Sequence, residues 1–321
     1  MERKVPPVNG RGRRETRQPV GGSPRQAKPP LGEFSAIVGV PAPDAAGTIE
    51  HRRLKTHVMT KIGIGQAAFR VGEPEHNRAI IHTLLEQADA LAVDVLVLPE
   101  LANSGYSLAG PEEAEQACEA VPGGPASQLL AQWSAGGRLV VAGLGEKADG
   151  RYYSAAGVFA DGRHRLTYRK IHLFNRESAL FSPGDQPPPV FEHAGGRYGV
   201  LVCFDWAFPE VFRVLALQGA QVVLHPANLV LPYCQAAMVT RSIENRIFTA
   251  MANRTGPDRD LHFRGESQIT APDGRVVARA AGDFAGILVA EVDLREADDK
   301  MITPFNHVLK DRRPELYGGG V

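Results

Sequence analysis

The chain has 321 residues, of which 43% are hydrophobic and 22% are charged, with 36 basic and 36 acidic side chains. This composition is typical of a globular protein with a substantial core, and the length suits one large α/β domain or two small ones. No apolar run is long enough to cross a bilayer, and no apolar stretch follows the basic N-terminus, so we predict neither a membrane partner nor a secretory signal.

The balanced net charge hides an asymmetry. Residues 1–58 hold 11 of the Lys and Arg residues but only 5 of the Asp and Glu residues, so the remainder is mildly acidic. This argues against a nucleic-acid-binding surface. The cysteines, Cys118, Cys203 and Cys234, are odd in number and lack short paired spacing, which excludes a disulfide framework and predicts a cytoplasmic protein. The histidines are scattered, and we expect neither a metal nor a cofactor.

Residues 1–58 are predicted to form a disordered N-terminal extension. The stretch from Val5 to Pro30 is rich in Pro, Gly, Arg and Gln and offers almost nothing to bury. An alternative interpretation places the true start at Met59, because the first regular strand is expected directly after it. Residues 59–321 contain no internal repeat and no linker, and we predict that they form a single domain.

From residue 59 onward, strand-like and helical patterns alternate along the chain. We expect strands at Lys61–Phe69, Val93–Leu98, Arg138–Gly143, Arg197–Val202, Ala220–His225, Ile247–Asn253, Ser267–Ala271, Val276–Ala278 and Gly286–Val292, with a hairpin around Asp161-Gly162. Helical spacing of apolar residues predicts helices at Asn77–Ala92, Pro111–Ala120, Ala126–Ala135, Phe208–Gln218 and Met238–Arg246. This mixture indicates a layered α/β domain.

Two reactive side chains follow predicted strands directly. Glu100 comes after VDVLVLP, and Cys203 comes between YGVLV and FDWAFPE, where a helix is expected to begin. In layered α/β proteins, functional sites gather at the carboxyl ends of strands. We therefore expect the first amides of the helix to point toward the thiol, lower its pKa and bind a developing oxyanion.

A thiol that attacks an amide or nitrile needs a proton acceptor. His225 ends the strand after the cysteine helix, so a Cys203–His225 dyad is one interpretation. The favoured alternative is Glu100, whose carboxylate would be partly desolvated and would have a raised pKa. Lys170 lies in TYRKIHLF, where mixed neighbours predict partial burial, and its ammonium would stabilise a thiolate and an oxyanion. Taken singly, each residue is more often structural than catalytic.

Three segments together resemble the nitrilase superfamily of carbon–nitrogen hydrolases. LPEL at 98–101, YRKIHLF at 168–174 and VCFDWAFPE at 202–210 are similar to its glutamate, lysine and cysteine motifs, in the same order. The resemblance runs from about Lys61 to Tyr317 and includes HPANLVLPY at 225–233, which looks like the amidase and nitrilase branches. It implies a four-layer α-β-β-α sandwich, a Glu100–Lys170–Cys203 triad and a thioester or thioimidate intermediate.

The resemblance also implies further site residues. Glu177, ahead of Phe-Ser-Pro-Gly, matches a second glutamate that orients the lysine and positions the nitrogen of the substrate. The Phe204 amide matches a second oxyanion donor, and Tyr106, Trp206 and Asn228 resemble residues of the pocket wall. Family members pair across helices, so we expect a homodimer or a higher homo-oligomer that acts on a small-molecule amide or nitrile.

Several functions share these residues. An amidase acting on a small carboxamide is our first interpretation, and a nitrilase is the second, because both reactions begin with the same thiolate attack. Asp205 favours the amidase, since many nitrilases carry glutamate at the matching position. An N-carbamoyl hydrolase is a third alternative. A non-enzymatic scaffold with an unreactive triad is the fourth, and it would leave Cys203 with an ordinary thiol pKa.

Overall fold

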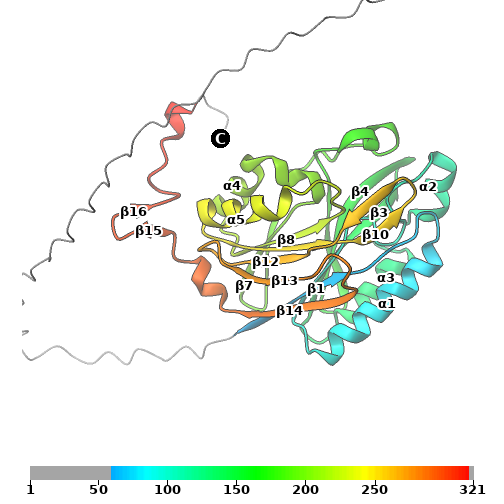
Figure 1. The fold of residues 1–321 in the computed structure, drawn as a ribbon, viewed down its shortest axis with the longest axis horizontal. Coiled ribbons are helices and arrows are strands. Elements are labelled where there is room, and N and C mark those ends of the chain that lie inside the picture. Colours follow the sequence, from blue (N-terminus) through cyan, green and yellow to red (C-terminus); the bar gives the residue numbers. More distant parts are fainter. Residues whose placement is uncertain (1–58, 318–321) are drawn as a thin grey trace, which may run out of the picture. The chain divides into compact units, whose positions relative to one another are not determined.

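The computed structural model describes residues 59–317, so the predictions for residues 1–58 lie outside the described part. Two six-stranded sheets stack face to face, and helices cover their outer faces (Figure 1). This arrangement is the predicted α-β-β-α sandwich, and the fold-class prediction is confirmed.

The first sheet has the strand order β14-β1-β2-β3-β4-β5. Strands β1 and β2 pair in parallel, as do β2 and β3, whereas the remaining neighbours pair antiparallel. The strands are β1 (Thr60–Gln66), β2 (Val95–Leu98), β3 (Leu139–Ala148), β4 (Arg151–Ala160), β5 (Arg163–Arg169) and β14 (Gly286–Val292). The carboxyl ends of β1, β2 and β3 therefore lie at one edge of the sheet.

The second sheet repeats this plan with the order β13-β12-β9-β8-β7-β6, and β7, β8 and β9 run parallel. Its strands are β6 (Val190–His193), β7 (Gly196–Val200), β8 (Val222–Ala227), β9 (Phe248–Asn253), β12 (Gln268–Thr270) and β13 (Val276–Arg279). Two separate ribbons, β10 (Thr255–Asp258) with β11 (Leu261–Arg264) and β15 (Met301–Thr303) with β16 (Asn306–His307), complete the strands of the described residues.

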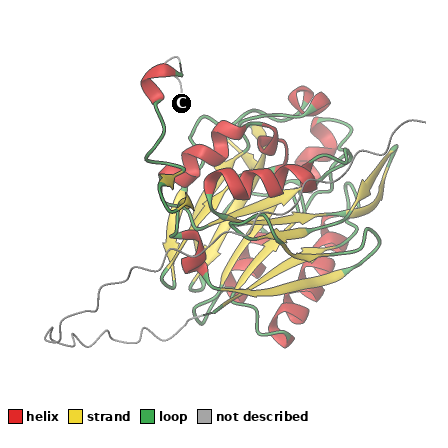
Figure 2. Cartoon of the chain, turned by 60° about the vertical axis from the view of Figure 1, so that its left-hand side comes forward, coloured by secondary structure: helices red, strands yellow, loops and turns green. Residues whose placement is uncertain are grey.

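The helices form the outer layers of the sandwich. Helices α1 (Pro74–Ala90) and α3 (Pro125–Trp133) cover the first sheet, and α4 (Pro209–Leu217) and α5 (Cys234–Asn245) cover the second (Figures 1 and 2). Helices α1, α3, α4 and the short α2 (Pro111–Ala117) begin with proline, which suits the first turn because proline lacks the backbone N–H that would find no helical acceptor there. None of the helices within residues 59–317 is long and apolar enough to cross a membrane.

Strand β2 shows how the sequence builds two cores at once. Val95 and Val97 point into the core between the sheets, whereas Leu96 and Leu98 join the core beneath α1 and α3. All of these side chains are buried, because side chains alternate between the two faces of a strand and both faces are covered here. A continuous apolar strand is therefore required at this position.

The structure corrects several predicted boundaries. Helix α5 begins at Cys234, about one turn before the expected Met238. The helix expected at Phe208–Gln218 is α4, and a 3₁₀ turn, Cys203–Ala207, precedes it. A second 3₁₀ turn, Asn175–Ala179, carries Glu177. The β10–β11 ribbon was not predicted, since TGPD contains glycine and proline, which strands disfavour.

Candidate active site

The reactive residues meet where strands of both sheets end. Glu100 follows β2, and Lys170 follows β5 of the same sheet, whereas Cys203 follows β7 of the facing sheet. Gly143 on β3 makes room for the glutamate, because a Cβ atom there would lie 2.2 Å from the Cα of Glu100. Glycine is thus required for the close approach of the two backbones.

A buried charged cluster lies on the side of the first sheet. The Lys170 Nζ atom donates to Oε1 of Glu100 at 2.9 Å and to both oxygens of Glu177 at 2.9 and 2.8 Å. Ser154 Oγ also donates to Glu100 Oε1, at 2.8 Å. Within residues 59–317, Oε2 of Glu100 has no hydrogen-bond partner, although it is buried. One carboxylate oxygen is therefore fixed and the other is available as a proton acceptor.

Burial shifts the pKa values of this cluster. Desolvation raises the pKa of Glu100 above its ordinary value, and the ammonium of Lys170 offsets part of that rise. This is the direction that the sequence predicted. Burial by itself would lower the pKa of Lys170, but the neighbouring Cys203, Glu100 and Glu177 raise it overall. Lys170 is therefore a permanent cation at neutral pH.

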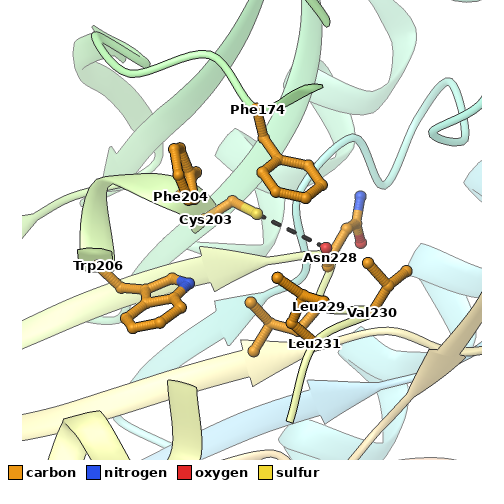
Figure 3. A pocket seen from close by; sticks show the side chains of 8 residues that line it. All are labelled: Phe174, Cys203, Phe204, Trp206, Asn228, Leu229, Val230 and Leu231. Atoms are coloured by element: carbon orange, nitrogen blue, oxygen red, sulfur yellow. Dashed lines mark hydrogen bonds between the residues drawn. The ribbon is translucent and has the colours of Figure 1, made fainter. Parts of the chain in front are cut away.

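Cys203 occupies a left-handed backbone conformation, with a φ of 43°. Its buried thiol donates to the Asn228 carbonyl oxygen at 3.6 Å (Figure 3). Burial, followed by the charge of Glu100, raises the pKa of the thiol well above its usual range. The predicted lowering of this pKa is therefore wrong, because desolvation outweighs the ammonium of Lys170. The Cys203 side chain is therefore a neutral thiol at neutral pH.

His225 lies near the nucleophile but faces its backbone. The Nε2 atom lies 3.1 Å from the Cys203 carbonyl oxygen, to which it must donate, and burial lowers the pKa of the imidazole to about 4. The ring is therefore neutral and engaged with the main chain. This geometry favours Glu100 over His225 as the proton acceptor for the thiol.

Sequence reasoning missed a hydrogen-bond network centred on Asp205. The buried carboxylate accepts from the Val202 amide at 3.0 Å, Tyr168 Oη at 2.9 Å and the His172 amide at 3.1 Å. The Nδ1 atom of His172 lies 2.8 Å away as well. Asp205 thus connects Val202, the residue before Cys203, to Tyr168 and His172. These two residues lie on either side of Lys170 in the sequence. Its polar position between apolar neighbours in the cysteine motif was the available signal.

Asp205 therefore does not face a substrate directly. Both of its oxygens are taken by Tyr168, His172 and Val202.

Tyr106 is held from three directions. Its hydroxyl donates to Glu177 Oε1 at 2.7 Å, its amide donates to Asp258 at 3.1 Å, and its ring meets the edge of Phe263 with centroids 5.4 Å apart. The buried Arg254 pairs with Asp258 and lies over the ring of Phe263. The β10–β11 ribbon therefore sets the position of Tyr106, and through it that of Glu177.

A small pocket with room of about 20 Å³ opens beside the thiol. Three of the four predicted binding residues line it together with Cys203, namely Phe204, Trp206 and Asn228 (Figure 3). Tyr106 instead lines an adjoining cavity. The remaining walls of the pocket are apolar: Phe174, Leu229, Val230 and Leu231. In the described part of the chain, no group of three or more His, Cys, Asp or Glu side chains could hold a metal ion.

Comparison with known proteins defines the class and then the family. Residues 61–299 match the family model of carbon-nitrogen hydrolases, so the chain is an enzyme of that class. It belongs to the nitrilase superfamily, as the three motifs indicated. A nitrilase from Pyrococcus abyssi is 38% identical over 260 residues, which cover 81% of this chain and 99% of the relative.

Two amidases are also similar. An (R)-stereoselective amidase from a Pseudomonas species is 35% identical over 80% of this chain and 93% of its own length. A variant of the amidase from Nesterenkonia sp. AN1 is 28% identical with a TM-score of 0.69, over 82% of this chain and 97% of that one. That structure shows covalent addition of the acetamide moiety of fluoroacetamide at the active site cysteine.

Proposed function

We propose that this enzyme is an amidase that releases ammonia from small carboxamides through a thioester on Cys203. The observation that carries the proposal is the unpartnered Oε2 of Glu100. It belongs to a buried carboxylate whose other oxygen is fixed by Lys170, next to a buried thiol. Few structural roles require a carboxylate with a raised pKa, an ammonium and a thiol together without solvent.

Acylation begins with proton transfer. The Glu100 carboxylate accepts the thiol proton as Sγ of Cys203 attacks the carbonyl carbon, and the carbonyl oxygen becomes an oxyanion. The Lys170 ammonium stabilises this charge, and so does the amide of Phe204, which donates to no other group in the described part of the chain. Glu100 then passes its proton to the nitrogen, the carbon–nitrogen bond breaks, and ammonia leaves.

Deacylation reverses these roles with water. Glu100 accepts a proton from the attacking water, the thioester carbon becomes tetrahedral, and the carbon–sulfur bond breaks. The proton returns to the sulfur, which restores the thiol and the free carboxylate. Glu177 takes no proton in this scheme, because its oxygens already accept from Lys170, Tyr106 and the Phe174 amide. Its role is to hold Lys170 in place.

The pocket supports a short, mainly apolar acyl group. Its room of about 20 Å³ is far smaller than a typical small-molecule site, and aromatic and aliphatic side chains form most of its wall, so the acyl group must be short. The Asn228 amide donates to the Glu100 carbonyl oxygen at 2.8 Å, while its own Oδ1 is buried without a partner among residues 59–317. That oxygen is placed to accept a hydrogen bond from the substrate.

A nitrilase is the second candidate, and the 38% identity to the Pyrococcus abyssi nitrilase favours it. Attack of the thiol on a nitrile would give a thioimidate. Addition of water to that carbon gives a tetrahedral intermediate, which expels ammonia and leaves the same thioester. The two reactions therefore differ only in the first adduct.

The decisive experiment measures ammonia release from matched amides and nitriles of the same small acids, with Cys203→Ala as the blank. Faster release from the amides, abolished in the variant, is the expected result. Faster release from the nitriles would make nitrilase the correct function. If neither series reacts but N-carbamoyl compounds do, the enzyme is an N-carbamoyl hydrolase. An unreactive protein whose thiol alkylates with an ordinary pKa would be the scaffold instead.

We also propose that the chain forms a homodimer. Three large hydrophobic side chains on or next to α4 and α5 are exposed: Leu217, Tyr233 and Ile243. Exposed apolar patches of this kind mark association surfaces. Sedimentation equilibrium should give twice the mass of one chain, and a Tyr233→Glu, Ile243→Glu variant should shift toward the monomer. A wild-type monomer at micromolar concentration would overturn this proposal.

A further inference from the structure

Two cavities adjoin at the candidate site, and they differ greatly in size. The inner pocket next to Cys203 has room of about 20 Å³, whereas a second, outer cavity has room of about 780 Å³ and opens to solvent. Phe174, Val230 and Leu231 line both, so these residues form the junction. A substrate bound at the junction can therefore extend far in one direction and little in the other.

The chemical groups of the site are divided between the same two cavities. The inner pocket holds the nucleophile, and no charged side chain lines it. The outer cavity holds Glu177 and Tyr106, which bond to each other and, through Lys170, connect to Glu100. The carbonyl carbon must meet Sγ of Cys203, whereas the leaving nitrogen must receive a proton from the carboxylate side. The scissile bond is thus directed from the inner pocket toward the outer cavity.

The view of the inner pocket agrees with this direction. Trp206 lies on one side of Cys203, and Val230, which belongs to the junction, lies on the other (Figure 3). An acyl group that fills the inner pocket meets the indole of Trp206, so its length is limited. A group attached to the nitrogen instead passes Val230 and enters the larger space.

We propose that the enzyme also cleaves N-substituted carboxamides, with a short acyl group in the inner pocket and the amine part in the outer cavity. This inference rests on the amidase proposed above and extends its substrate class from primary to secondary amides. Charged residues of both signs line the outer cavity, including Arg176 and Asp260. Leu108, Leu180 and Phe181 give the same cavity apolar walls, so an uncharged alkyl substituent on the nitrogen is the simplest occupant.

Cleavage of an N-substituted amide uses the same bond changes and proton transfers as cleavage of a primary amide. The sulfur–carbon bond forms, the thiol proton passes through Glu100 to the nitrogen, and the carbon–nitrogen bond breaks. A primary amine leaves in place of ammonia, through the wide cavity that opens to solvent. Water then cleaves the thioester to the carboxylic acid and restores the thiol.

The test compares two series of substrates of increasing length on the full chain. One series lengthens the acyl group of primary amides from propionamide to octanamide, and the other lengthens the N-alkyl group of propionamide from methyl to hexyl. Released acid is measured in both. We expect kcat/KM to fall at least tenfold along the acyl series and to change less than threefold from N-methyl to N-hexyl.

A pair of variants tests whether the outer cavity holds the substituent. Ala179 lines the outer cavity, whereas the adjacent, equally exposed Ser178 lines neither cavity. Ala179→Trp should lower the ratio of N-hexyl to primary amide turnover at least tenfold, and Ser178→Trp should leave this ratio within twofold of wild type. The ratio cancels any general loss of folded protein.

The outcomes separate the two proposals. Turnover of propionamide without turnover of its N-alkyl derivatives would overturn the inference and keep the amidase. A steeper fall along the N-alkyl series than along the acyl series would also overturn it, because the acyl group would then occupy the outer cavity. Failure of both series would overturn the amidase and the inference together.

Discussion

The two sheets contribute unlike halves of the candidate site. The first sheet supplies Glu100 and Lys170, which form buried ionic hydrogen bonds of 2.9 Å. The second sheet supplies Cys203, whose thiol donates to the Asn228 carbonyl oxygen at 3.6 Å and whose backbone is left-handed. The buried charged groups thus lie on one sheet, and the cysteine with a strained backbone lies on the other. Substitutions on the two sheets should therefore change activity and stability in different ways.

The largest expected effect separates the acceptor from the nucleophile. Cys203→Ala and Glu100→Gln should each lower kcat by on the order of 10⁴-fold or more, because neither chemical role has a substitute. Only the Glu100 variant should show alkylation by iodoacetamide at position 203 at alkaline pH, since Cys118 and Cys234 are present in both variants. Measured kcat and mass spectrometry of the alkylated protein check this, and near wild-type acylation in Glu100→Gln would reassign the base to His225.

The same Glu100→Gln variant should not lose stability at pH 8. The pKa of Glu100 is raised in the folded state, so the stability it contributes is present below its unfolded pKa and is lost as pH rises through the folded pKa. Replacing the ionised Glu100 carboxylate with a neutral amide therefore removes an unfavourable contribution to the free energy of folding. Urea unfolding at pH 8 should show a variant at least as stable as wild type, and a markedly lower midpoint would contradict the desolvation argument.

Lys170→Met should lower both kcat and the free energy of unfolding. Loss of one oxyanion donor lowers kcat by about 10²–10³-fold. Loss of the only ammonium between Glu100 and Glu177 among the described contacts leaves buried carboxylates uncompensated, at a cost of about 3–5 kcal/mol in unfolding free energy. Kinetics and urea unfolding measure the two losses, and a fully stable variant would show that the cluster is solvated.

The pH dependence of kcat/KM should distinguish the effect of Glu100 from that of Lys170. As pH falls through the raised pKa of Glu100, the carboxylate takes up a proton and cannot accept one from the thiol, so kcat/KM should fall about tenfold per pH unit. The pKa of Lys170 is raised, so its ammonium should cause no alkaline loss. A pH profile whose acid limb lies at or below 4.5, the ordinary value for glutamate, would contradict this prediction.

Asp205→Asn tests the connection between the sheets. Three donors point at the two carboxylate oxygens, and an amide can accept at only one of them. We expect kcat to fall about 10- to 100-fold and the unfolding free energy to fall by about 1–3 kcal/mol. Ser242→Ala, which loses a buried hydroxyl contact to Thr249 away from the pocket, is the control and should keep its kcat. Equal loss of activity in both variants would make the role of Asp205 purely structural.

The smallest effect is expected for Tyr106→Phe. This change removes one hydrogen bond to Glu177 and keeps the ring against Phe263. A hydrogen bond to a charged group contributes about 1.5–3 kcal/mol, and Lys170 still holds Glu177, so kcat should fall only about three- to tenfold. Steady-state kinetics with unchanged KM would agree. A loss as large as that of Lys170→Met would give Tyr106 a direct role in proton transfer.

Much of the fold was readable from the sequence because it depends on local patterns. The apolar runs before Glu100 and Cys203 predicted the two strand ends, and the α/β sandwich followed from the three motifs. The Asp205 network was not readable, because Tyr168 and His172 lie more than 30 residues away in sequence. The direction of the thiol pKa was predicted wrongly for a related reason, since burial depends on how many distant segments cover a residue.

The left-handed backbone of Cys203 has a practical consequence for capturing bound substrate. Alanine at this position is as disfavoured in that conformation as cysteine, so Cys203→Ala leaves the energetic balance of the turn almost as it was. Glycine would relieve the strain, stabilise the fold and at the same time free the turn to move. An inactive form intended for crystallographic trapping should therefore carry alanine, while a glycine form would report how much folding stability the nucleophile costs.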